Sequence, residues 1–239
     1  MEATVGIQVL VTAHNSERYL QSSLNSILPA IRDRPWVFIF NDDGSTDNTL
    51  QIAKSFSRSC GADHVTLYKS DKHQTVGAAK NTTFSLINSY RKGYPYICVH
   101  DSDDLMFPTR VEGLLNVIDE RKCKFVHGDY LYESKNYNGT VSCVKQSPLL
   151  GFGVWATLFH ESLVPQDGSF FRTDLEVFED HAKWWDLRYT DKVDIQPAHG
   201  VMTNHYIKRD TSMTCKVTNE QIDKLKTIRA NVYKHPLVT

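Results

Sequence analysis

The chain has 239 residues, a formal net charge of −1, and ordinary fractions of hydrophobic (41%) and charged (23%) residues. This length allows one substantial hydrophobic core, either as one large domain or as one domain with a small appendage. The near-zero net charge provides no general attraction for nucleic acid or for an anionic membrane. Neither is therefore the expected partner, although a local basic patch would still allow one.

The cysteines and the N-terminus predict a cytoplasmic protein. The five cysteines are odd in number and lack the paired short spacing of zinc sites or disulfide frameworks, so we expect reduced, packed thiols; they are Cys60, Cys98, Cys123, Cys143 and Cys215. The first residues do not resemble a secretory signal, and no apolar stretch reaches membrane-spanning length. We therefore expect no transmembrane segment.

The first half of the sequence alternates short apolar runs with amphipathic helical patterns. The runs cover residues 6–12, 36–41, 64–69 and 96–100, and the helical patterns cover residues 17–28, 49–58, 78–91 and 108–121. Residues typical of helix ends flank these patterns, namely Ser16, Gly61, Gly93 and Pro108. The alternation predicts an α/β fold with a mainly parallel central sheet flanked by crossover helices.

After residue 124 the pattern changes. Residues 125–132 predict another strand, and the polar stretch 133–144 predicts a hairpin around an Asn-Gly pair. The Gly- and aromatic-rich segment 149–171 has no clear period and is either an acceptor-side wall or a packed loop. Helical spacing of apolar residues in 219–229 predicts a terminal helix that docks on the domain. Without a repeat or linker, residues 1–239 are expected to form a single domain.

An acidic run, formed by Asp101, Ser102, Asp103 and Asp104, follows the fourth predicted strand. Carboxylate oxygens suit Mg²⁺ or Mn²⁺, which keep open positions for phosphates, so the run predicts a metal–diphosphate site. The alternative is a solvated turn that caps the next helix. Polar loops at 12–15 and 41–45 also follow strands. Because ligands bind beyond the carboxyl ends of parallel strands, the three loops are expected to meet in one cleft.

An ordered set of motifs makes the sequence resemble the inverting glycosyltransferases of family 2. The resemblance runs from about residue 6 to about residue 215 and rests on motifs at 11–15 (VTAHN), 41–49 (NDDGSTDNT), 77–81 (GAAKN), 101–104 (DSDD), 128–130 (GDY), 171–172 (FR), 179–180 (ED) and 206–214. It implies a GT-A fold, a Rossmann-like fold that binds nucleotide sugars. The donor would bind in about residues 1–124, and the acceptor side would lie in about residues 125–239 with the C-terminal helix.

The resemblance implies a binding role for several donor-side residues. Thr12 and Asp43 would contact the nucleobase, with Ala13 and Asn15 in the same site, although Asp43 is also a typical turn residue. Gly77 would let the backbone approach the ribose or the phosphates.

Lys80 stands where the family usually has arginine. It would neutralise phosphate as a point charge, or else be an exposed helical lysine.

In the acidic run, the resemblance assigns the metal to the carboxylates. Asp103 would be the direct ligand of Mn²⁺ or Mg²⁺, Asp101 would face the ribose or the water shell of the metal, and Asp104 would be an additional ligand or orient the others. Ser102 would contact the donor. A cation held there would stabilise the charge of the leaving diphosphate.

Inverting transfer also needs a base near the acceptor, and Asp180 matches the family's base. The alternatives are that Asp180 is an ordinary N-cap or that Glu179 is the base. In the late loop, Arg209 stands where many relatives carry histidine. Either Arg209 or Lys208 would bind the diphosphate directly, or His205 would take the place of that histidine.

The aromatic-rich segment offers a second open question. Its side chains would form either a sugar-stacking wall or part of the core; they are Trp155, Phe159, His160 and, from the later helix, Trp185.

The expected activity is a metal-dependent inverting transfer of a sugar from a nucleoside-diphosphate donor, UDP-linked, to an acceptor hydroxyl. The acceptor would be a glycan, a lipid-linked molecule, a protein or a small molecule, with nucleic acid least favoured; a lipid acceptor would be reached peripherally. Two alternatives stay open: a nucleotidyltransferase that makes a nucleotide sugar, and a catalytically silent nucleotide-sugar-binding subunit.

Overall fold

The computed structural model describes residues 5–89, 92–134, 141–144, 153–208 and 217–233. The strands are β1 (Ile7–Ala13), β2 (Trp36–Asp42), β3 (His64–Lys69), β4 (Tyr96–Asp101), β5 (Leu105–Met106), β6 (Phe125–Ser134), β7 (Val141–Val144), β8 (Thr157–His160) and β9 (Ile195–Lys208). The α-helices are α1 (Glu17–Ala30), α2 (Thr49–Ser57), α3 (Val76–Ser85), α4 (Arg110–Arg121), α5 (Glu179–Trp185) and α6 (Asn219–Tyr233). Short 3₁₀ turns cover Leu86–Ser89, Val154–Ala156 and Glu161–Leu163, and a π-helical turn covers Asp186–Thr190.

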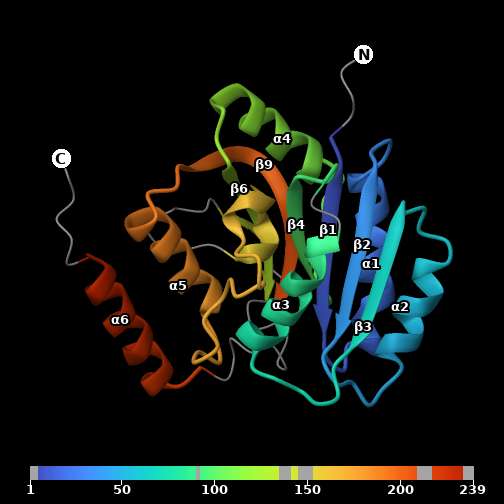
Figure 1. Ribbon diagram of the computed structural model, residues 1–239, viewed down its shortest axis with the longest axis horizontal. Helices are drawn as coiled ribbons and strands as arrows, with labels where there is room; N and C mark the ends of the chain where they lie inside the picture. Colours follow the sequence, from blue (N-terminus) through green and yellow to red (C-terminus); the bar gives the residue numbers. More distant parts are fainter. Residues whose placement is uncertain (1–4, 90–91, 135–140, 145–152, 209–216, 234–239) are drawn as a thin grey trace.

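One curled sheet runs through the described part of the chain in the order β3-β2-β1-β4-β8-β6-β9-β5, with β7 beside β6 (Figure 1). The pairs β1–β2, β1–β4 and β2–β3 are parallel, which confirms the sheet predicted for the first half. In the second half β6 pairs with β9 in parallel, while β4–β8, β6–β8, β5–β9 and β6–β7 are antiparallel. The β6–β7 pairing confirms the expected hairpin, whose turn lies outside the described residues.

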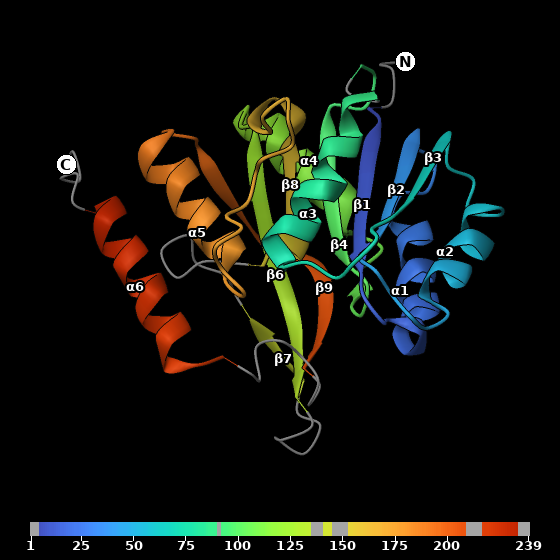
Figure 2. The same cartoon turned by 60° about the horizontal axis from the view of Figure 1, so that its bottom comes forward.

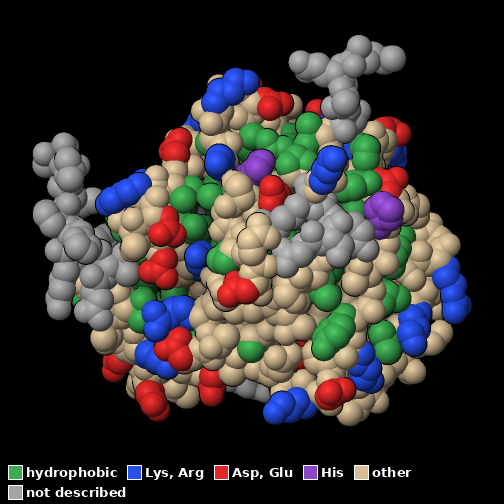
Figure 3. All heavy atoms as spheres, in the orientation of Figure 1, with side chains coloured by type: hydrophobic (Ala, Val, Ile, Leu, Met, Phe, Trp, Pro, Cys, Tyr) green, Lys and Arg blue, Asp and Glu red, His purple; other side chains and the backbone are tan. Residues whose placement is uncertain are grey.

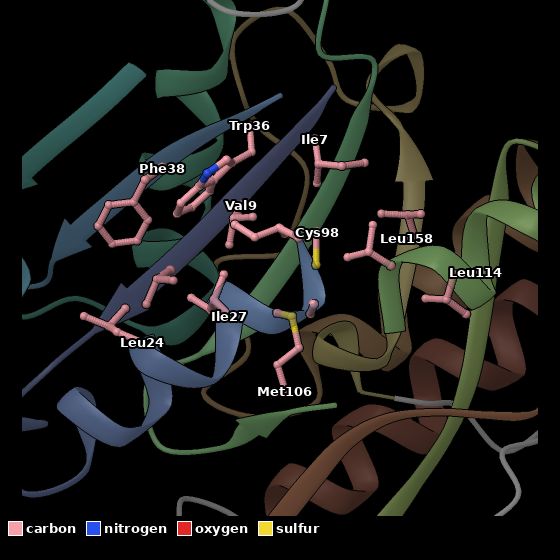
Figure 4. Close-up of a cluster of buried hydrophobic side chains, with 14 of the residues drawn as sticks. Ile7, Val9, Leu24, Ile27, Trp36, Phe38, Cys98, Met106, Leu114 and Leu158 are labelled. Atoms are coloured by element: carbon pink, nitrogen blue, oxygen red, sulfur yellow. The ribbon is translucent and has the colours of Figure 1, made fainter. Parts of the chain in front are cut away.

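Helices cover both faces of the sheet (Figure 2). On one face, side chains of β1 and β2 pack against α1, α2 and α4, as Figure 4 shows for Val9, Leu24, Ile27 and Phe38. On the other face, Leu10 and its neighbours pack with side chains of α3 and α5. Because both faces of the central strands β1, β2 and β4 are buried, these strands appear in the sequence as largely apolar runs. The residues of the edge strand β3 are exposed or half-buried.

The strand register brings the carboxyl ends of the first four strands to one edge. Thr12 pairs with Asp101 of β4, Ala13 pairs with Asp42 of β2, and Asp42 pairs with Lys69 of β3. The loops that follow these strands are therefore neighbours, as the sequence predicted. Several helix boundaries differ from expectation. The first helix ends at Ala30 instead of residue 28, and the third ends at Ser85 instead of residue 91. The third helix begins at Val76 because Thr75 caps it by accepting a hydrogen bond from the Ala78 amide, and the fourth begins at Arg110.

The terminal helix α6 docks on the second half of the domain, as predicted. Lys224 forms an ion pair with Asp174 at 3.4 Å, and the Arg229 guanidinium lies over the Trp185 ring of α5. Positive and negative side chains are interspersed on the face shown in Figure 3. Among the described residues, no helix combines the length and the apolar composition that crossing a membrane would require.

The three cysteines whose side chains are described, Cys60, Cys98 and Cys123, are buried free thiols, as expected. Burial raises the pKa of each thiol above its ordinary value.

Candidate functional site

The first part of the candidate site surrounds Asp43, at the end of β2. Asp43 is 2% exposed, and its carboxylate is held in place by the loop after β3. Oδ2 accepts hydrogen bonds from His73 Nδ1 at 2.7 Å and from the Gln74 amide at 3.1 Å, while Oδ1 accepts one from Gln74 Nε2 at 3.1 Å. The carboxylate is therefore pre-oriented, as recognition of a nucleobase edge requires.

The loop after β1 closes the same corner. The Ala13 carbonyl accepts a hydrogen bond from the Asp43 amide at 2.8 Å. Asn15 adopts a left-handed conformation with φ of 46°, which asparagine tolerates, and its amide donates to Ser45 Oγ at 2.9 Å. The Thr12 hydroxyl lies 2.7 Å from that of Thr83 in α3. These residues line one corner, and their contacts with a nucleotide remain predictions.

Gly77 has a packing role that the sequence did not indicate. A Cβ atom at this position would lie 2.0 Å from the Arg172 carbonyl oxygen, so the close approach it permits is to the protein's own loop. Asn81, one turn further along α3, binds the same loop by donating to the Phe171 carbonyl at 2.8 Å and accepting from the Phe170 amide at 3.0 Å. The first turns of α3 therefore anchor the segment that leads into α5.

The acidic run begins where β4 ends. Asp101 and Asp103 are partly exposed, whereas the Ser102 hydroxyl is buried 2.8 Å from that of Ser16. Burial raises the pKa of Asp101, Lys80 lowers it, and the carboxylates of Asp103, Glu179 and Asp180 raise it, to about 6.

Asp101 and Asp103 both present carboxylate oxygens where β4 ends, and a hard divalent cation fits such oxygen donors.

Lys80 is buried, which rules out the alternative of an exposed helical lysine. Its Nζ lies 2.7 Å from Glu179 Oε1, and the two side chains are 9% and 5% exposed. Burial alone lowers the pKa of Lys80, but the carboxylates of Glu179, Asp101 and Asp180 outweigh burial and raise the pKa well above its ordinary value. Lys80 is therefore a fixed positive charge between the acidic run and α5.

Asp104 differs from its neighbours because it is completely buried. The Arg110 guanidinium, also fully buried, lies near it and donates to the carbonyls of Val99 at 2.8 Å and Thr157 at 2.9 Å and to Asn204 Oδ1 at 3.0 Å. Burial lowers the pKa of Arg110, while Cys98, Asp101 and Asp104 raise it. This setting favours Asp104 as the internal counter-charge of Arg110 rather than as an open metal ligand.

Asp180 lies in the first turn of α5, directly after Glu179, the ion-pair partner of Lys80. Its Oδ2 accepts from the Val154 amide at 3.1 Å, and its Oδ1 accepts from the His181 amide at 2.8 Å. The residue that precedes this turn, Phe178, has φ of 64°, a left-handed conformation that is costly for an aromatic residue. Asp180 is thus a fixed carboxylate whose charge acts on both Asp101 and Lys80.

The remaining predictions have mixed outcomes. Arg209 lies outside the described residues. His205 Nε2 lies 2.8 Å from Glu133 Oε2 on the neighbouring strand. Phe159 and Trp185 are 0% and 4% exposed, so the idea that they stack on a sugar is wrong.

The residues that the sequence did not predict are His73 and Gln74 on Asp43, and Arg110 behind the acidic run. His73 and Gln74 follow β3, so the rule that ligands bind beyond strand ends could have included their loop. Arg110 belongs to a helix whose apolar pattern gives no sign that its first residue points inward.

Comparison with known proteins agrees with this geometry. The sequence model described as Glycosyl transferase family 2 matches residues 8–173, more than half of the chain. EpsE of Bacillus subtilis, a putative glycosyltransferase, is 31% identical over 48% of this chain and 39% of its own length. The dTDP-rhamnosyl transferase RfbG of Shigella flexneri is 28% identical over 45% of this chain and 36% of its own. The chain thus spans well under half the length of these curated relatives.

Two solved structures share the fold. TarS of S. aureus in complex with UDP-GlcNAc superposes with a TM-score of 0.75 at 17% identity, covering 98% of this chain and 68% of that one. The mannosyltransferase PcManGT of Pyrobaculum calidifontis, in complex with GDP-Man and Mn²⁺, gives a TM-score of 0.63 at 16% identity, with coverage of 96% and 62%. This likeness shows the GT-A fold. Together with the match over residues 8–173, it shows that the chain belongs to glycosyl transferase family 2.

Proposed function

We propose that this chain carries a metal-dependent, inverting glycosyltransferase site that moves a sugar from a UDP-linked donor to an acceptor hydroxyl. The observation that supports this most is the 2.7 Å ion pair between Lys80, whose charge acts on Asp101, and Glu179, because it ties the first turn of α5 and its Asp180 to the acidic run. One site thereby combines a pair of cation-suited carboxylates with a separate carboxylate on another element. A nucleotide-binding module alone has no need of that second carboxylate.

In the proposed reaction Asp180 accepts the proton of the acceptor hydroxyl as its oxygen attacks the anomeric carbon. The new C–O bond forms on the face opposite the bond to the diphosphate, which breaks with its electron pair, so the configuration inverts. The amides of Val154 and His181 hold the carboxylate of Asp180 in position. Mn²⁺ or Mg²⁺ bound at Asp103, with Asp101 beside it, would stabilise the charge of the leaving diphosphate.

On the donor side, Asp43 would pair with the imide edge of uracil, in the corner formed by Thr12, Ala13 and Asn15. Lys80, which Glu179 holds in place, would be the cation nearest the phosphates, with Arg209 supplying a second positive charge. The relatives and fold neighbours are named for dTDP-, UDP- and GDP-linked sugars, so the nucleotide is the first property to test.

We further propose that residues 1–239 act as one domain in the cytoplasm. The acceptor would be a glycan, a lipid-linked molecule, a protein or a small molecule. A lipid-linked acceptor would be reached from the membrane surface.

The donor is tested by incubating the protein and Mn²⁺ with UDP-, dTDP- and GDP-sugars and measuring the released nucleoside diphosphate. Slow release from UDP-sugars is expected, and its removal by a chelator would establish metal dependence. Release of pyrophosphate from a nucleoside triphosphate and a sugar phosphate would instead identify a nucleotidyltransferase. No release in either assay, with tight nucleotide-sugar binding, would identify a silent binding subunit.

The roles of the two carboxylates are tested separately. Asp180→Asn is expected to lower turnover by about 10²- to 10⁴-fold with little change in donor binding, because it removes only the base. Asp103→Asn is expected to weaken Mn²⁺-dependent donor binding. Asp194→Asn, at an exposed position, is the matched control. Full activity of Asp180→Asn, or an unchanged metal titration of Asp103→Asn, would contradict the assigned role.

A further inference from the structure

The corner around Asp43 contains two histidines that the proposed reaction does not use. The rings of His14 and His73 stack with their centroids 3.8 Å apart at an angle of 24°. His14 comes from the loop after β1 and His73 from the loop after β3, so both lie at the same edge of the sheet as Asp43. In the part of the chain that the structure describes, these three residues are the one group of at least three potential metal-binding side chains whose ligand atoms lie within 4.8 Å of one another.

The hydrogen bonds of the two rings assign the tautomer that each ring has in its neutral form. His14 Nδ1 lies 2.8 Å from the Asp43 carbonyl oxygen, which can only accept, so Nδ1 of His14 carries the proton. His14 Nε2 then accepts from Asn15 Nδ2 at 3.0 Å. His73 Nδ1 donates to Asp43 Oδ2 at 2.7 Å, which leaves a lone pair on Nε2 of a side chain that is 59% exposed.

The surroundings of His14 match those of metal-binding histidines in proteins. Such histidines commonly donate their second nitrogen to a carboxylate or a backbone carbonyl, which fixes the ring and makes the metal-facing nitrogen more basic. The Asp43 carbonyl holds His14 in this way, and a metal at His14 Nε2 would take the place of the Asn15 amide. The hydrogen bond from His73 Nδ1 to Asp43 Oδ2 joins two of the candidate ligands, and a metal between these atoms would replace its proton. Gln74 in turn holds the carboxylate of Asp43 through two hydrogen bonds.

We propose that His14, Asp43 and His73 bind a borderline transition-metal ion such as Zn²⁺, at a site separate from the cation site of the acidic run. Two imidazoles and one carboxylate favour Zn²⁺, Co²⁺ or Ni²⁺, whereas the oxygen-only donors of Asp101 and Asp103 favour Mg²⁺ or Mn²⁺. Tetrahedral coordination with bonds of about 2.1 Å places ligand atoms about 3.4 Å apart. His73 Nδ1 and Asp43 Oδ2 lie 2.7 Å apart, so a metal between them has to move them apart. The exposed side chain of His73 can supply that movement by rotation.

Zinc at this site has a consequence that rests on the proposed function. If Asp43 binds the nucleobase, a metal ion on the same carboxylate competes with the donor. Zn²⁺ and the nucleotide then exclude one another, while Mn²⁺ at the acidic run does not exclude the nucleotide.

The test uses the metal-free protein and two direct readouts of binding, calorimetry with Zn²⁺ and the visible absorption of bound Co²⁺. One tight site is expected. Zinc binding should weaken by more than about tenfold in His73→Gln and in His14→Gln, since each variant removes one ligand. The matched control is His199→Gln, because His199 is also exposed and lies 3.3 Å from a buried carboxylate, that of Asp129, outside the group. Circular dichroism verifies that each variant is folded.

The proposal is overturned if the wild-type protein binds no Zn²⁺, or if the three variants bind it equally well. If His73→Gln weakens UDP binding while the wild-type protein binds no Zn²⁺, the histidine pair serves the nucleobase alone, which also overturns the metal site. A repeat of the Zn²⁺ titration with saturating UDP separates the two ideas. An unchanged Zn²⁺ affinity would show that Zn²⁺ and UDP do not compete for Asp43. It would therefore contradict the proposed contact of Asp43 with the nucleobase, while the metal site itself would stand.

Discussion

The buried ion pair between Lys80 and Glu179 leads to an asymmetric prediction for stability. The atoms are 2.7 Å apart and both side chains are almost fully buried, so removing one partner leaves the other charge in a medium that solvates it poorly. Lys80→Met leaves Glu179 uncompensated and also removes the cation that offsets Asp101 and Asp180. We expect this substitution to lower the free energy of unfolding by about 3–5 kcal/mol.

Glu179→Gln has a smaller expected cost because Lys80 keeps the charges of Asp101 and Asp180 nearby. We expect a loss of about 1–3 kcal/mol. In the double variant, neither buried charge is left without its partner. The double variant should therefore cost less than the sum of the single variants by at least about 1 kcal/mol.

Urea unfolding without metal or donor, followed by tryptophan fluorescence, measures these free energies independently of activity. Asp223→Asn is the matched control. It breaks an ion pair with Lys226 at 2.9 Å whose side chains are 70% and 71% exposed, so it should cost less than about 1 kcal/mol. The reasoning is refuted if Glu179→Gln costs as much as Lys80→Met, if the single costs add exactly, or if the buried pair costs no more than the exposed one.

Three further predictions concern buried groups. Burial lowers the pKa of His127 from 6.5 to about 4, so below pH 6.5 the unfolded chain binds more protons than the folded protein and the free energy of unfolding falls on acidification. Between about pH 7 and about pH 5, His127→Gln should remove about 2 kcal/mol of this loss. A variant with the pH profile of the wild-type protein would contradict the prediction. Gly77→Ala should destabilise the protein by about 1–3 kcal/mol because its Cβ would meet backbone, whereas Gly113→Ala, which meets only a valine side chain, should cost less in the same urea assay. Arg110→Lys should lower the free energy of unfolding by at least about 2 kcal/mol and weaken Mn²⁺-dependent donor binding, because lysine lacks the planar group that reaches three acceptors. A variant whose urea midpoint and Mn²⁺ midpoint equal those of the wild-type protein would count against this role.

Local sequence patterns were enough to predict the first half of the fold. The runs that became β1, β2 and β4 are largely apolar and alternate with amphipathic patterns, which is typical of a parallel sheet buried on both faces. The edge strand β3, whose residues are exposed or half-buried, followed from its place in this alternation. The loops at one edge then followed from the direction of the strands. The second half was less predictable because its antiparallel strands β8 and β5 are only four and two residues long and lie among irregular segments.

The candidate site divides in the same way. The sequence by itself determined which carboxylates follow strand ends, and the order of its motifs singled out Asp103 and Asp180. Only the tertiary structure decided their surroundings: Lys80 meets Glu179 across 99 positions of the chain, Arg110 meets Asn204 across 94, and Asp43 meets His73 across 30. Sequence periodicity reports which side chains share a face of one element, whereas these contacts depend on how separate elements pack across the sheet. Lys80, which the sequence predicted to lie either on phosphate or in solvent, is therefore a buried charge between the acidic run and α5.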